Sequence, residues 1–133
     1  MSAGPRAAMR AMAGGNYISV ESFRRDGTAV RTPMWFVAEN DGAEPVFYLS
    51  TNADSFKVKR MRRTPRVRIA ACDRRGRVSG DWVEAQATVV GEPEQGRATK
   101  AFDRKYFPWK QVINLMSCVM RYRRAVVAIR AAS

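Results

Sequence analysis

The residues best suited to binding chemistry in this sequence form a dense run of cations. Ten of the 24 Lys and Arg residues lie between Lys57 and Arg77, and Asp73 is the only acid among them. Asp54 or Ser55, just before this run, can cap a short helix, and Ser55 also offers a hydroxyl. A helix amino terminus presents unpaired N–H groups and the positive end of its dipole, so Ser55 and Lys57 together favour a bound phosphate. On charge alone, a solvated basic face explains the run equally well.

The composition limits the kinds of ligand and reaction in which these cations can take part. A net charge of +12 favours anionic partners, which are nucleic acid, a membrane surface or a polyanionic small molecule. The chain has no histidine, so it lacks the usual general base of hydrolytic triads and the commonest metal ligand. Cys72 and Cys118 have no metal-binding spacing around them. We therefore expect no metal site, and we expect a cofactor to supply the chemistry if the protein is an enzyme.

The sequence shows no sign of export or membrane insertion. Residues 1–15 contain no apolar signal segment, and no later stretch approaches the length of a membrane span. Two cysteines are too few for a disulfide framework, and reduced thiols are typical of cytosolic proteins. We therefore expect a soluble cytoplasmic protein without a membrane partner, and its 133 residues fit a single domain, 1–133.

The elements that must position the cations are mostly strands. Helical spacing predicts an amino-terminal helix within residues 1–15, a short basic helix that Thr64-Pro65 ends, and a helical insertion over residues 94–120. Pro33 cannot donate to a ladder, so we expect an edge strand or a bulge there. Alternating or doubly apolar runs predict strands over residues 17–23, 28–38, 46–51, 66–72, 82–91 and 125–129.

These elements predict a mainly β protein. Meandering antiparallel strands with a helix between the third and fourth suit a small β-barrel with flanking helices. The run 46–51 is apolar on both faces, which predicts a central strand.

Five segments of the sequence resemble, in order along the chain, those of a known family. They are residues 17–27, 32–36, 55–62, 65–68 and 72–76, and they cover most of residues 17–91. The family is the flavin reductase-like split β-barrel proteins related to pyridoxamine phosphate oxidase, and the resemblance points to its deazaflavin-dependent oxidoreductases, which use coenzyme F-420. It implies a six- to seven-stranded antiparallel split β-barrel. It also implies an oxidoreductase that transfers a hydride from reduced F-420 to a small organic acceptor.

The resemblance also implies where the cofactor binds. In that family the site forms where two subunits meet, so we expect a homodimer acting on a small-molecule substrate. The cofactor phosphate is held by residues matching Ser55 and Lys57, supported by those matching Lys59 and Arg60. The cofactor ring lies along the backbone of residues matching Thr32, Pro33, Met34, Trp35, Ser50 and Thr51.

The acidic tail of F-420 would bind the cations that remain after one phosphate is neutralised. The cofactor carries a phosphodiester and an oligoglutamate tail, so it is a polyanion. Phe56 departs from the family pattern, which has Arg or Gly between the Ser and the Lys, and it could stack on the ligand or narrow the phosphate mouth. No catalytic residue is assigned, and a proton donor could be water, Tyr17, Tyr48 or Tyr106. The candidates for contact with the tail are Arg62, Arg66, Arg68 and Arg74.

Two alternative interpretations stay open. A barrel of the same fold could bind FMN, or a tetrapyrrole, instead of F-420. A basic barrel could also bind nucleic acid, with the helix on phosphates and Trp35, Phe47 or Tyr48 stacked on bases. Because the aromatic residues do not interleave with the cations, we expect no nucleic-acid partner.

Overall fold

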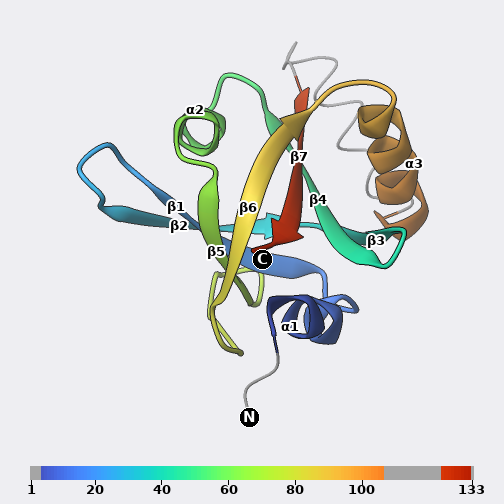
Figure 1. The fold of residues 1–133 in the computed structure, drawn as a ribbon, viewed down its shortest axis with the longest axis horizontal. Coiled ribbons are helices and arrows are strands. Elements are labelled where there is room, and N and C mark those ends of the chain that lie inside the picture. Colours follow the sequence, from blue (N-terminus) through green and yellow to red (C-terminus); the bar gives the residue numbers. More distant parts are fainter. Residues whose placement is uncertain (1–3, 107–123, 133) are drawn as a thin grey trace.

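Seven strands form a single antiparallel sheet that curls into a split barrel (Figure 1). The computed structural model describes residues 4–106 and 124–132. The predicted fold class is confirmed: mainly β, an antiparallel split β-barrel of the flavin reductase and pyridoxamine phosphate oxidase type with flanking helices. The elements are α1 (Pro5–Met12), β1 (Tyr17–Phe23), β2 (Ala29–Trp35), β3 (Val37–Asp41), β4 (Glu44–Asn52), α2 (Phe56–Arg63), β5 (Arg66–Ala71), β6 (Val83–Val90), α3 (Glu94–Tyr106) and β7 (Arg124–Ala131).

The order of the strands explains why the sheet closes. It is β2-β1-β5-β6-β7-β4-β3, so β2 and β3 lie at the two edges although only Phe36 separates them along the chain. In a flat sheet these edges would lie roughly 29 Å apart, at about 4.8 Å per strand. One residue spans about 3.5 Å at most. The sheet must therefore curl until both edges meet at Phe36.

The prediction of one continuous strand over residues 28–38 is wrong at Phe36. The chain leaves β2 there and enters β3 at the opposite edge of the sheet. The Phe36 side chain is fully buried against Phe47, with ring centroids 4.6 Å apart. Its carbonyl oxygen accepts a hydrogen bond from Lys105 Nζ at 2.9 Å. The predicted edge position of Pro33 is confirmed, because β2 is an edge strand.

The barrel interior holds the main hydrophobic core. Alternate strand residues such as Ile18 and Val20 of β1 point into it, which is the period of two that predicted the strands. Met9 of α1 and Met61 of α2 belong to the same core. Both helices therefore dock on the barrel through apolar side chains.

A second core lies on the outer face of β3, β4 and β7, under α3. Ala98, Ala101 and Phe102 of α3 pack there. β4 contributes Phe47 to the inner core and Tyr48 to the outer one, and it lies between β7 and β3. This double burial confirms the predicted central strand.

The helical insertion predicted over residues 94–120 begins as α3. Its continuation falls in residues 107–123, outside the described residues. Among the helices that are described, none is both long and apolar enough to cross a membrane.

Candidate functional site

The predicted phosphate-binding helix, α2, follows directly on strand β4. Ser55 is its N-cap, and the Ser55 Oγ accepts a hydrogen bond from the Val58 N–H at 3.4 Å, as the sequence predicts. The main-chain N–H groups of Phe56 and Lys57 have no acceptor among the described residues. These unused N–H donors at the start of the helix, together with the Lys57 cation, can bind an anion.

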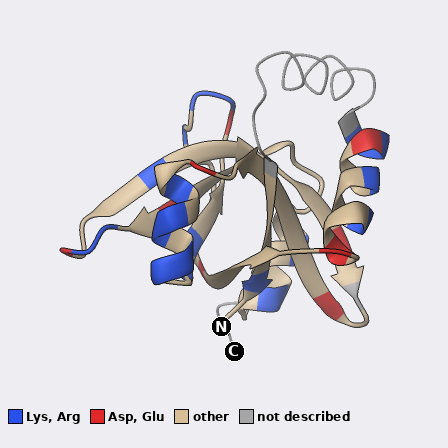
Figure 2. Ribbon diagram, turned by 90° about the horizontal axis from the view of Figure 1, so that it is seen from above, with Lys and Arg blue, Asp and Glu red and all other residues tan. Residues whose placement is uncertain are grey.

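A groove lies between α2 and the turn that joins β1 to β2. Its volume is about 530 Å³. Figure 2 shows Lys and Arg gathered on α2 and on the nearby hairpin. Two hydrogen bonds hold α2 against β1: Arg60 Nε donates to Ser22 Oγ at 2.8 Å, and Arg63 Nη2 donates to the Phe23 carbonyl oxygen at 3.5 Å. We call this the basic groove, and it is lined by Arg24, Arg25, Phe56, Lys59, Arg60 and Arg63.

None of the five cations of the basic groove forms a salt bridge among the described residues, and Arg24 interacts at longer range with the Asp26 carboxylate of the same turn. The pKa of Arg60 lies below the ordinary guanidinium value, first because the group is partly buried and then because Arg24 and Arg63 repel its charge. Such mutual repulsion is relieved when an anion binds between the cations. The basic groove is therefore a region of unneutralised positive potential.

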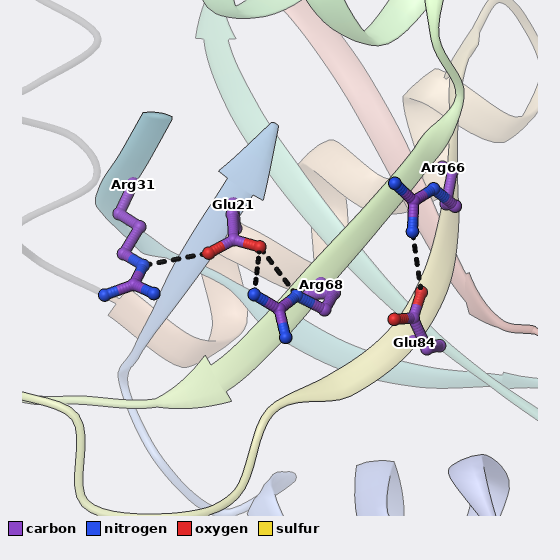
Figure 3. A network of polar contacts seen from close by, with 5 residues as sticks. All are labelled: Glu21, Arg31, Arg66, Arg68 and Glu84. Carbon is purple, nitrogen blue, oxygen red and sulfur yellow. Dashed lines mark hydrogen bonds and ion pairs between the residues drawn. The ribbon is translucent and has the colours of Figure 1, made fainter. Parts of the chain in front are cut away.

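Other cations of the same region are already paired (Figure 3). Arg68 contacts Glu21 Oε1 at 2.6 Å through Nε and Nη2, and Arg31 Nε donates to Glu21 Oε2 at 2.9 Å. Arg66 Nη1 lies 3.8 Å from Glu84 Oε2. Two of the arginines that the sequence offers to an acidic tail, Arg66 and Arg68, are thus partly neutralised within the chain.

Four of the predicted ring-contact residues lie on β2. Pro33 is exposed, Thr32 and Trp35 are half-buried, and Met34 is buried in the barrel core. The outer edge of β2 pairs with no described strand. The outward-facing hydrogen-bonding groups of β2 are therefore not used by a neighbouring described strand.

The other predicted ring contacts, Ser50 and Thr51, lie near the end of β4. Ser50 is half-buried, Thr51 is buried, and both pair with β7. Neither of them lines the basic groove, and Lys57 does not line it either, whereas Lys59 and Arg60 do. The structure thus groups Lys59 and Arg60 with the β1–β2 turn and places Lys57 at the helix start.

Three cations of the basic groove are absent from the site predicted by sequence. Arg63 follows Arg60 by three positions on the same helix, so helical spacing alone could have identified it. Arg24 and Arg25 come from the β1–β2 turn, and they approach α2 because Ser22 and Arg60 join β1 to that helix. No spacing in the sequence encodes that contact.

Comparison with known proteins finds solved structures with a similar fold. No protein-family model matches the chain, and no curated protein sequence matches it. A conserved hypothetical protein from Mycobacterium tuberculosis is 28% identical over 100% of this chain and 82% of its own, with a TM-score of 0.66. An F420 reductase is 17% identical over 93% of each chain, with a TM-score of 0.55. HutZ, the heme storage protein from Vibrio cholerae, is 9% identical over 98% of this chain and 92% of its own, with a TM-score of 0.70.

These similarities concern the fold. The reductase and the heme storage protein are both so distant in sequence that only the shared architecture carries over. One fold serves a reductase and a storage protein, so the cofactor and activity of this chain have to be argued from its own residues.

Proposed function

We propose that this protein is an oxidoreductase that uses reduced coenzyme F-420 to transfer a hydride to a small organic acceptor. The observation that carries the proposal is the start of α2. Unused main-chain donors and Lys57 lie there on the helix that also forms the basic groove, which has no acid among its lining residues. A cofactor with a phosphodiester and an acidic tail can use more of these cations than the single phosphate of FMN. Likeness in fold to an F420 reductase supports the same choice.

Different parts of the proposed site bind different parts of the cofactor. Ser55 and Lys57 bind the phosphate, and Lys59 and Arg60 add positive charge around it. A bound deazaflavin supplies the hydride in its reduced form. The task of the chain is to orient the ring and exclude water, which depends on geometry more than on a protein acid or base. The ring lies along the backbone of Thr32, Pro33, Met34, Trp35, Ser50 and Thr51.

A side-by-side titration with F-420 and FMN tests the proposal. The purified protein is expected to be colourless, to bind F-420 more tightly than FMN, and to oxidise reduced F-420 in the presence of an electron-poor acceptor. A yellow preparation with stoichiometric FMN, or equal affinity for the two cofactors, would contradict the choice of F-420 and favour the FMN alternative.

Replacing Lys57 by alanine is expected to weaken F-420 binding by about 1.5–3 kcal/mol, the scale of a charge-assisted hydrogen bond. The reason is that Lys57 is the cation placed beside the unused donors of α2. Fluorescence titration measures the effect. Lys100→Ala is the matched control, because Lys100 is an exposed lysine on α3, and it should bind F-420 as the parent does. Equal losses in the two variants would contradict a phosphate site at α2.

We also propose that the active form is a cytoplasmic homodimer with the cofactor between its subunits. The outer edge of β2 pairs with no described strand and carries four of the proposed ring contacts, which supports a site that a second subunit completes. Sedimentation equilibrium at micromolar concentration is expected to give about twice the 15.0 kDa mass of the chain. A species of the single-chain mass alone would remove the dimer from the proposal.

A further inference from the structure

We propose that the basic groove is a binding site for a ligand that carries several adjacent anionic groups, and that it extends beyond the phosphate contacts of Ser55 and Lys57 at the start of α2. The inference rests on the groove itself and does not depend on which cofactor the protein uses.

The charge of the basic groove exceeds what one phosphate can neutralise. Its five cations face a volume of about 530 Å³ with no acid among the lining residues. A phosphate monoester brings a charge of about −2 at neutral pH. Two or more adjacent carboxylates or phosphates are needed to balance the rest. The groove therefore selects for oligoanions over single phosphates.

Two of the five cations, Arg60 and Arg63, are held in place by hydrogen bonds to β1, which distinguishes the α2 wall of the groove from an ordinary solvated surface. Arg60 is half-buried, and its Nε is fixed to Ser22 Oγ at 2.8 Å. Arg63 is tied to the main chain of Phe23. Keeping a partly buried Arg60 next to Arg24 and Arg63 is electrostatically unfavourable, as its lowered pKa shows. On the neighbouring outer face of β1, by contrast, Glu21 neutralises the arginines that meet there.

Two elements form the opposite walls of the basic groove. Arg24 and Arg25 belong to the β1–β2 turn, while Lys59, Arg60 and Arg63 belong to α2. A ligand with several anionic groups can contact both walls at once, which a single phosphate at one wall cannot do. We therefore assign to Arg24 and Arg25 the discrimination between one anionic group and several.

Tripolyphosphate and inorganic phosphate are the probes that test this assignment. Isothermal titration of the intact protein is expected to show tighter binding of tripolyphosphate, weakening as salt rises because exposed charges are screened. The double variant Arg24→Ala/Arg25→Ala should lose tripolyphosphate affinity by about tenfold or more, the scale of charged hydrogen bonds. The double variant Arg24→Lys/Arg25→Lys should retain most of it. Circular dichroism of both variants checks that the turn remains folded.

Lys100→Ala is the control for the loss of one positive charge. Lys100 is exposed on α3 and does not line the basic groove. Its replacement is expected to change tripolyphosphate affinity by less than about twofold, as for an isolated surface charge. Equal binding of phosphate and tripolyphosphate by the parent protein overturns the proposal. Losses in Lys100→Ala proportional to those of the double variant also overturn it, because they describe a diffuse charged surface.

A second arm identifies the source of the oligoanion. If the groove takes the acidic tail of F-420, removing the tail should lower affinity in the parent protein and not in Arg24→Ala/Arg25→Ala. If it takes a separate oligoanion, F-420 affinity should be the same in both proteins while tripolyphosphate affinity differs. Failure of F-420 to bind at all would contradict the proposed function and leave the tripolyphosphate result to decide the groove.

Discussion

Replacing Phe36 by alanine is expected to lower the free energy of unfolding by about 3–5 kcal/mol, the range for removing a buried aromatic side chain. Phe36 is fully buried, and its ring packs 4.6 Å from that of Phe47. It is also the single residue between the two edge strands of the sheet. The loss is a large part of the roughly 5–15 kcal/mol that stabilises most domains. Urea denaturation followed by circular dichroism measures it.

Phe56→Ala is the matched control for this prediction. It removes the same atoms from a side chain that is 76% exposed, so the free energy of unfolding should change by no more than about 0.5 kcal/mol. If the two variants lose similar stability, Phe36 does not have the structural role assigned to it.

Replacing Glu21 by glutamine is expected to lower the free energy of unfolding by about 2 kcal/mol at neutral pH, the scale of hydrogen bonds to a charged group. The Glu21 side chain is fully buried between Arg31 and Arg68, whose side chains are 57% and 34% exposed. A neutral amide leaves both guanidinium groups without their counter-charge. Because the two arginines are partly exposed, solvent screens part of their attraction to Glu21. The expected loss in the free energy of unfolding is therefore smaller than for a fully buried ion pair.

The same carboxylate predicts a pH dependence of stability. Burial alone would raise the pKa of Glu21, but the hydrogen bonds and charges of Arg31 and Arg68 outweigh it, so the pKa lies below the ordinary value of 4.5. A depressed folded-state pKa gives stability that is present above pH 4.5 and is lost as the pH falls through the folded pKa. The parent protein should therefore lose more stability than Glu21→Gln between pH 5 and strongly acidic pH.

Glu84→Gln is the control for both measurements on Glu21. Glu84 is 49% exposed and lies 3.8 Å from Arg66 on the neighbouring strand, so its replacement should change stability by less than about 1 kcal/mol. Equal effects of the two substitutions at neutral pH, or parallel pH profiles of the parent and Glu21→Gln, would show that burial of Glu21 is energetically unimportant.

Much of the fold could be predicted from the sequence because local patterns determine it. The two-sided apolar run of β4 and the end of α2 before Pro65 are each encoded within a few residues. The break at Phe36 could not be predicted, because strand alternation continues through it. Only the closure of the whole sheet requires the chain to change edges there.

The candidate site shows the same division between local and tertiary information. The cap at Ser55 and the cations of α2 follow from neighbouring residues. Neighbouring residues do not show which cations are neutralised, because Glu21 contacts Arg68, which lies 47 positions further along the chain. The sequence therefore indicates that an anion binds near α2, whereas the structure separates free cations from paired ones.

The position of β7 has a consequence for the order in which the protein can fold. This strand comes last among the described elements, yet it pairs with β6 on one side and β4 on the other. Before β7 is synthesised, the described strands form two pieces of sheet, β2-β1-β5-β6 and β4-β3, which Phe36 links but no strand pairing joins, and the edges of β6 and β4 that β7 will cover are open. Such edges are prone to pair with other chains. These edges stay exposed in a nascent chain until β7 pairs with both pieces. Because β7 joins segments that are distant in sequence, folding is expected to be slow.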